Sequence, residues 1–149
     1  MANIRGFEFP DDLYYLMEHD AWARLDSDGC VTVGITSLGA HISGEFIEFM
    51  AKPVGEPVAR EGSLGLLEMS KVIRSIRAPV GGVLIETNAR AKSEPKLINA
   101  SPYDDGWLVR IRPLAWEEDS RLLVKGSGVP GAAQAYMALL AETFDAPPP

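Results

Sequence analysis

The sequence predicts a mainly β fold with flanking helices, closed into a sandwich-like barrel. Short runs rich in Val, Ile and Leu recur through the centre of the chain, and several alternate apolar with polar residues, as strands do. Gly, Pro and Asp-Gly turns separate these runs. A helical period preceded by Pro-Gly appears only near the C-terminus. These features favour strands for the body and a helix for the end.

The expected strands lie at residues 21–26, 31–36, 44–50, 63–68, 72–78, 82–87 and 107–112. The first two are joined by Asp28-Gly29, which is a strong hairpin signal because Gly adopts the positive φ that such turns require. Ser37 is expected to cap a short helix that ends at residue 42.

The two ends of the chain are expected to pack on the same domain. Residues 1–20 form an N-terminal lead in which Asp11 and Asp12 cap a helical turn. Residues 21–113 form the β domain, 114–145 a helical segment with its main helix at 131–144, and 146–149 a disordered tail. The helix has an apolar stripe of Ala132, Ala135, Tyr136, Leu139, Leu140 and Thr143/Phe144. We expect this stripe to dock on the barrel; binding a partner is the alternative.

Composition excludes several classes of protein. The chain has 149 residues and a net charge of −7, which argues against general nucleic-acid binding. It has no apolar run long enough to span a bilayer and no signal-peptide core at its start, so we expect a cytoplasmic protein without a membrane partner. The single cysteine, Cys30, excludes an internal disulfide.

No side-chain cluster in the sequence resembles an active site. Cys30 is expected to be a small apolar side chain, with a reactive thiol as the alternative. His19 and His41 lack ligand spacing, so no metal site is expected. Nucleophile elbows, phosphate-binding loops and dinucleotide fingerprints are missing. The chemistry of such a protein would reside in an attached cofactor.

Lys71 is the strongest candidate for the attachment point. It lies between two strand-like runs, within the polar break Glu68-Met69-Ser70-Lys71, and a Pro-Gly turn follows the second run. The pattern predicts a hairpin with Lys71 at its tip, where a modifying enzyme has access. The alternatives are an ordinary surface lysine, or a Schiff-base nucleophile, which would require a buried amine or cationic neighbours.

Most of the chain resembles the glycine cleavage system H protein family. The similar segments occur in family order and at family-like spacing: Trp22-Ala23-Arg24, Asp28 to Thr36, Val54 to Val58, Glu68 with Lys71, Ala78 to Gly82, and Pro95 to Ile111. The last segment is especially specific, because a Pro-Tyr-x-x-Gly-Trp turn leads into an alternating strand.

The resemblance implies a biotinyl/lipoyl hammerhead, a flattened β-barrel/sandwich hybrid with a C-terminal helix, which acts as a non-catalytic carrier. It implies lipoic acid in amide linkage to Lys71 and a role for Glu68 in recognition by lipoate ligase or lipoyl synthase-type attaching enzymes. The family usually has Glu-Ser-Val-Lys-Ala where this chain has Glu68-Met69-Ser70-Lys71-Val72. A biotinyl lysine typically lies between two methionines, and Lys71 does not.

The ends of the chain resemble a particular branch of this family. Residues 6–15, 19–22 and 113–128 are similar to lipoate-binding proteins that accompany the heterodisulfide-reductase-like complex of sulfur oxidation. This branch implies a carrier of sulfur intermediates. The alternatives are a glycine cleavage H protein, which carries the aminomethyl group from glycine among the P, T and L proteins, and an unmodified scaffold in lipoate assembly.

Four basic residues are expected to gather near the lysine hairpin: Arg74, Arg77, Lys92 and Lys96. Such a basic end would suit anionic sulfur intermediates or an acidic partner, with Arg74 and Arg77 as contacts. The alternative is a set of solvated charges that are separate in space.

Overall fold

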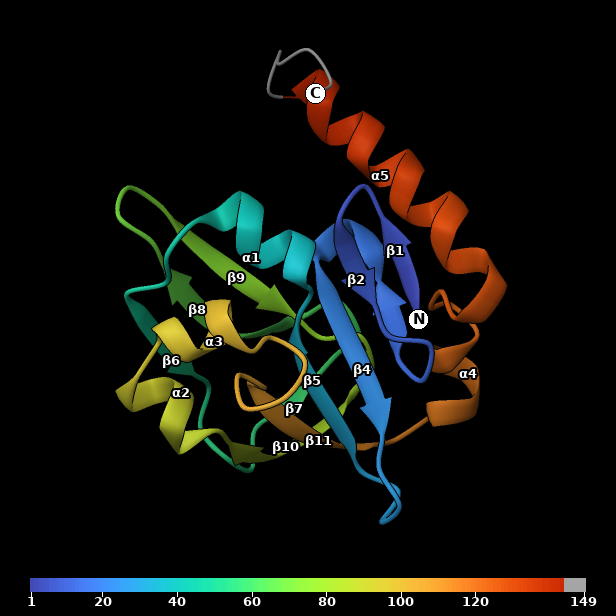
Figure 1. The fold of residues 1–149 in the computed structure, drawn as a ribbon. Helices are drawn as coiled ribbons and strands as arrows, with labels where there is room; N and C mark the ends of the chain where they lie inside the picture. The colour runs from blue at the N-terminus through green and yellow to red at the C-terminus, as the bar shows by residue number, and fades with distance from the viewer. Residues whose placement is uncertain (144–149) are drawn as a thin grey trace.

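The computed structural model describes residues 1–143 and has a mainly β body (Figure 1). Its largest sheet has six strands in the order β3-β4-β5-β11-β10-β7. Their bounds are Tyr14–Leu16, Ala21–Leu25, Val31–Ile35, Val109–Pro113, Gly82–Thr87 and Pro57–Val58. All neighbouring strands in this sheet are antiparallel.

A second sheet has three antiparallel strands in the order β6-β8-β9, with bounds Glu48–Ala51, Ser63–Glu68 and Ile73–Arg77. One hydrophobic core joins the two sheets: it includes Val33 and Ile111 from the first and Leu67 and Ile76 from the second. This arrangement confirms the predicted mainly β class. The predicted bounds of β8 and β10 match those of the structure, and the strand predicted at 44–50 starts later, at Glu48.

Trp22 fixes the middle of the six-stranded sheet. Its indole is fully buried, and Nε1 donates hydrogen bonds to the carbonyls of Ile35 and Pro102, 3.1 and 3.0 Å away. The ring lies directly over Gly34, where an added Cβ would be 2.4 Å from a ring carbon. Gly34 therefore makes room for the indole that joins β4 and β5 to the segment before β11.

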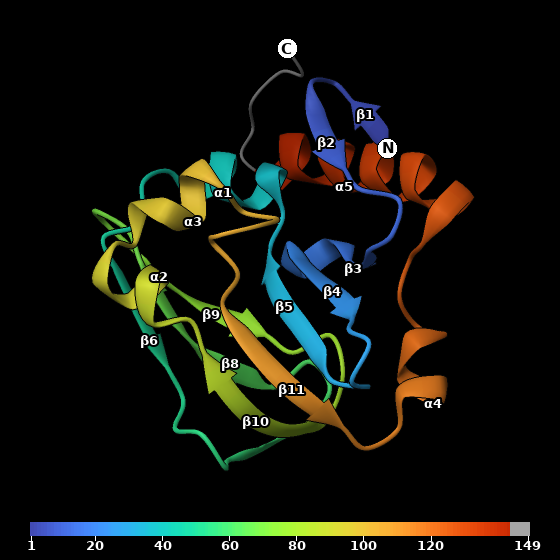
Figure 2. The ribbon, with the colours of Figure 1, turned by 60° about the horizontal axis from the view of Figure 1, so that its bottom comes forward.

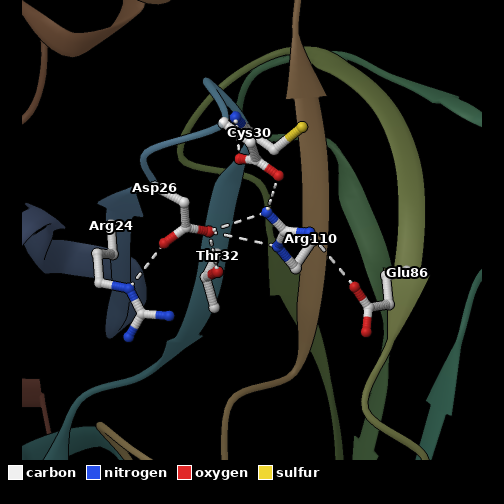
Figure 3. Close-up of polar contacts among 7 residues, drawn as sticks. Arg24, Asp26, Cys30, Thr32, Glu86 and Arg110 are labelled. Atoms are coloured by element: carbon white, nitrogen blue, oxygen red, sulfur yellow. Dashed lines mark hydrogen bonds and ion pairs between the residues drawn. The ribbon is translucent and has the colours of Figure 1, made fainter.

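The β4–β5 hairpin turns at Asp28-Gly29, as predicted, with Gly29 at φ +85°. Arg110 on β11 bridges this hairpin to β10, since its guanidinium pairs with Asp26, Asp28 and Glu86 (Figure 3). Partial burial alone would raise the pKa of Asp26, but hydrogen bonds from Thr32 and Arg24 and nearby positive charges outweigh it. The net pKa of Asp26 lies below its usual range.

The N-terminal lead differs from the prediction. Instead of a helical turn capped by Asp11 and Asp12, it contains the β1–β2 hairpin (Ala2–Ile4, Phe7–Phe9), strand β3 and a 3₁₀ turn, η1, at Met17–His19. Where the helical turn was expected, Tyr14 to Leu16 pair with Ala21 to Ala23 of β4, and this pairing supplies the backbone hydrogen-bond partners that a helix would have provided.

The C-terminal helix α5, Val129–Thr143, confirms the predicted helix and starts two residues earlier. It packs beside β1 and η1 (Figures 1 and 2). Its buried positions include Val129, Ala133 and Met137, whereas Ala135 and Leu139 of the predicted stripe are exposed. The predicted stripe docks in part, since Ala132 and Tyr136 pack against a second core cluster that includes these buried positions, but the most buried positions of the helix lie beside the stripe. Phe144 and the tail predicted at 146–149 lie outside the described residues.

Short helices complete the fold. Helix α1, Ser37–Ser43, is capped by the side chain of Thr36, which accepts from the Gly39 amide, and not by Ser37 as predicted. Helices α2, Ala89–Ser93, and α3, Lys96–Ala100, precede β11, and α4, Trp116–Ser120, and the 3₁₀ turn η2, Gly126–Gly128, follow it. None of the helices in the described part of the chain combines the length and apolar character needed to cross a bilayer.

Candidate attachment site

Lys71 lies at the tip of the β8–β9 hairpin, which projects from the three-stranded sheet beside α1 (Figure 1). The Met69 amide donates to the Val72 carbonyl at 2.8 Å, so Ser70 and Lys71 are the two central residues of the turn. Both are exposed. The predicted hairpin and the placement of Lys71 at its tip agree with the structure.

The base of the turn is held by side chains in the hydrophobic core. Met69 is only 7% exposed and belongs to the main core, as does Leu67 on β8. Two residues before Leu67 on the same strand, Gly65 has φ +144°, and a Cβ there would be 2.3 Å from the Met50 carbonyl oxygen. Because β6 approaches β8 so closely at this point, the base of the hairpin is tightly held while its tip remains in solvent.

The Lys71 amine has no hydrogen bond or ion pair to any residue that the structure describes. It borders an open depression on the hairpin together with Glu68, Met69, Ser70, Val72 and Ile73. An exposed, unpartnered amine can be acylated without breaking an existing interaction. Its surroundings therefore fit an amide-linked cofactor.

Glu68 is the last residue of β8 and lies directly opposite Glu48 on β6 and Ile73 on β9. Its carboxylate makes no hydrogen bond or ion pair within residues 1–143. Glu68 is half-buried three residues before Lys71 and borders the open depression at the hairpin tip, where an approaching enzyme can contact it.

Arg74 is not the free surface cation that the sequence suggested. Its Nη2 lies 2.9 Å from Oδ2 of Asp20 and its Nη1 donates to Oγ of Ser43 at 2.8 Å. Asp20 is buried, and Tyr136 of α5 lies close to it. Burial, followed by the Asp20 charge, raises the pKa of Tyr136. The guanidinium thus joins β9 to the body of the protein.

The other three basic residues lie away from the hairpin tip. Arg77 lies at the opposite end of β9, opposite Ser63, and its Nη1 donates to the Glu61 carbonyl. Lys92 is on α2 and Lys96 begins α3, both away from the tip in Figure 1, and Lys96 pairs with Glu45 at 3.6 Å. The expected basic cluster is wrong, because Arg74 and Arg77 lie at different ends of β9 and the two lysines lie on helices α2 and α3. The charges beside the tip are those of Glu48 and Glu68.

The structure also brings together groups that are distant in sequence. Nε2 of His19 lies 3.5 Å from Oε1 of Glu61, and Glu18 adds a third ligand-type atom within 4.8 Å of both. Arg60 also pairs with Glu61, so the carboxylate is shared between two partners. Because Glu61 is far from His19 in sequence, this group could not be recognised from the sequence alone.

His41 and Cys30 lie in different surroundings. The His41 ring is 5.2 Å from the Phe7 ring, and both border a hollow of about 470 Å³ that also reaches Asn99 and Tyr103. Cys30 is half-buried in the β4–β5 hairpin, at the opposite end of the molecule from the β8–β9 tip (Figures 1 and 3). Neither lies at the lysine hairpin.

Comparisons with known proteins agree on one family. A family model described as "Glycine cleavage H-protein" matches residues 13–132. "Glycine cleavage system H protein 2" of Aquifex aeolicus is 36% identical over 126 residues, covering 85% of this chain and 78% of that protein. "Probable glycine cleavage system H protein 3" of Sulfurisphaera tokodaii is 41% identical over 109 residues, covering 73% and 79%.

Solved structures add a likeness of fold. The crystal structure of a glycine cleavage system H protein from Mycobacterium marinum superposes with a TM-score of 0.72 at 30% sequence identity. The match covers 89% of this chain and 99% of that one.

Proposed function

The chain belongs to the glycine cleavage H-protein family, and from that premise we propose that Lys71 is its lipoyl attachment site. Proteins of this family have a lipoyl-type fold and are non-catalytic carriers with lipoate joined to a lysine. The observation that carries the proposal is the exposed, unpartnered amine at the tip of an anchored two-residue turn.

The chain's part in attachment is nucleophilic. The deprotonated Lys71 amine attacks the carboxyl carbon of lipoyl adenylate, which an attaching enzyme makes from lipoate and ATP. An amide C–N bond forms, the acyl–phosphate bond breaks, AMP leaves, and the amine gives up a proton. Glu68, half-buried three residues away on the same hairpin, is a contact for that enzyme. Lipoate ligase and lipoyl synthase-type enzymes are the corresponding partners.

The fold fixes the backbone to which the lipoyl-lysine side chain, the arm, would be attached. Met69 and Leu67 fix the base of the hairpin in the core, so the Lys71 backbone keeps its place while the side chain moves. Bound lipoate supplies a reversible disulfide/dithiol. A mobile arm on a fixed point raises the local concentration of its end around a docked enzyme.

For the cargo, we propose sulfur intermediates, passed to and from a heterodisulfide-reductase-like complex. The segments that resemble the sulfur branch support this choice, because they form one structural unit: Tyr15 and Val124 exchange backbone hydrogen bonds, and Tyr14 packs edge-on against Trp116 at 4.9 Å.

Glycine cleavage is the second candidate, in which the chain serves the P, T and L proteins. The observation in its favour is that the matched relatives bear that system's name. Protein purified without reductant from cells grown on a reduced sulfur compound distinguishes the two. A sulfur adduct on the lipoyl-protein supports the sulfur role, and an aminomethyl adduct supports glycine cleavage.

The attachment site is tested by lipoylation in vitro. Apo-protein is incubated with lipoate, ATP and a lipoate–protein ligase, and its intact mass is measured. We expect one lipoyl increment in the wild type and in Lys96→Arg, and none in Lys71→Arg. An unmodified wild type, or a modified Lys71→Arg, contradicts the proposal; the unmodified scaffold would then be the better account.

A further inference from the structure

The outer face of the β6–β8–β9 sheet is an exposed surface next to the lysine hairpin. In this sheet, residues directly opposite one another share a face. One row across the strands is Glu48, Glu68 and Ile73, and the next row on the same face is Met50, Leu66 and Ser75. We call these six residues the outer face. The alternate rows, which contain Phe49 and Leu67 in one and Ile76 in the next, point into the core.

Exposed apolar side chains concentrate on this sheet and its hairpin. Of twelve large apolar residues that are exposed in the described part of the chain, five lie here: Ile47, Met50, Leu66, Val72 and Ile73. Leu66 is 38% and Ile73 is 53% exposed, although both are in strands. Such a patch beside a modification site is typical of a surface that another protein covers.

The charges on the outer face have one sign. Glu48 and Glu68 are direct cross-strand neighbours, and neither carboxylate has a hydrogen bond or ion pair within residues 1–143. Like charges in this relationship destabilise a sheet. A positively charged group placed over the pair would remove that repulsion, which makes the face complementary to a basic surface.

We propose that the outer face is the docking surface for the enzyme that attaches lipoate, and that this enzyme covers it with a surface of apolar and basic residues. The inference rests on the proposed attachment at Lys71. During attachment the reacting atom is the lysine amine itself, so the enzyme must lie against β8 and β9 and hold the amine in line with the activated carboxyl. Enzymes that react with the sulfur end of the lipoyl-lysine arm do not need to contact β8 and β9.

Two variants test the face without altering the amine. Glu48→Lys reverses a charge and relieves the repulsion with Glu68, so the melting temperature should be equal or higher. Leu66→Ser removes exposed apolar surface. Glu118→Lys and Leu122→Ser are the matched controls: both residues are exposed and lie in or next to α4, far from the hairpin tip (Figure 1).

The readout is the initial rate of lipoylation by a purified lipoate–protein ligase with lipoate and ATP, at increasing carrier concentration. We expect Glu48→Lys to raise KM for the carrier about tenfold and Leu66→Ser about fivefold, with kcat within about twofold, because encounter and not chemistry is weakened. Added salt should raise KM of the wild type more than KM of Glu48→Lys.

Other results overturn the inference in distinguishable ways. If the wild type is lipoylated on Lys71 and both variants match their controls, the docking surface is wrong and the proposed function stands. If the wild type is not lipoylated, both fail. If Leu66→Ser only dissociates a dimer seen by sedimentation, the face belongs to a second copy of the chain; if the variants slow only later transfer steps, it belongs to another enzyme.

Discussion

The guanidinium of Arg74 and the carboxylate of Asp20 form an ion pair, 2.9 Å apart, directly behind the lysine hairpin. The Asp20 side chain is only 3% exposed, and its other oxygen is buried without a hydrogen bond among the described residues. Arg74 also holds Ser43 at the end of α1. The pair therefore fixes β9, and with it the direction of the hairpin, relative to the turn before β4.

Replacing Arg74 should destabilise the protein strongly. Arg74→Met leaves the Asp20 carboxylate buried without its partner, and losing one member of a buried pair costs about 3 kcal/mol. Urea unfolding, followed by Trp fluorescence, measures the change. Arg77→Met is the control, since Arg77 lies at the far end of the same strand and contacts only a backbone carbonyl at 3.4 Å. Equal effects of the two variants would show that the pair contributes little.

Gly34→Ala should disturb the Trp22 packing. The new Cβ would lie 2.4 Å from the indole, so the ring or the strand must shift, at a cost of about 1–3 kcal/mol. The near-UV circular dichroism of the buried indole should change as well. Gly131→Ala serves for comparison, because no atom lies within 4 Å of its Cβ position in helix α5, and Ala there should be neutral or slightly stabilising. A normal spectrum for Gly34→Ala would contradict the packing described.

Asp26 should make stability depend on acid pH. The pKa of its carboxyl is lower in the folded protein than its usual value near 4, so its contribution is fully present above about pH 4. It is lost as the pH falls through the folded-state pKa. Asp26→Asn should therefore cost about 1–2 kcal/mol at pH 7 and progressively less in acid. Unfolding of both proteins at several pH values measures this difference, and a constant difference across pH would be inconsistent with the ionised network in Figure 3.

The sequence was sufficient for the body of the fold because its signals are local. Asp28-Gly29 defines one hairpin, and the polar break between apolar runs defines the hairpin of Lys71. The predicted bounds of the strands in these two hairpins, β4 and β5 in the first and β8 and β9 in the second, agree with the structure to within one residue. The position of Lys71 at a tip could likewise be predicted, because turn and strand patterns depend on neighbouring residues alone.

The environment of the site could not be predicted in the same way. Arg74 follows Lys71 by three residues and suggested a basic tip, but its partner Asp20 comes from a distant part of the chain. The opposed pair Glu48 and Glu68 depends on the register of β6 with β8. In the N-terminal lead, pairing of β1 with β2 and of Tyr15 with Val124 replaced the expected helical turn. The β1–β2 hairpin is local, but the Arg74–Asp20, Glu48–Glu68 and Tyr15–Val124 contacts join residues that are distant in sequence.

The most direct test is peptide mapping by tandem mass spectrometry of the protein isolated from its native cells. We expect a lipoyl amide on Lys71 and on no other lysine, with the native intact mass raised by one lipoyl group and the Lys71→Arg variant at its unmodified mass. Native protein whose Lys71 is a free amine, or whose lipoyl group is on another lysine, would contradict the central claim.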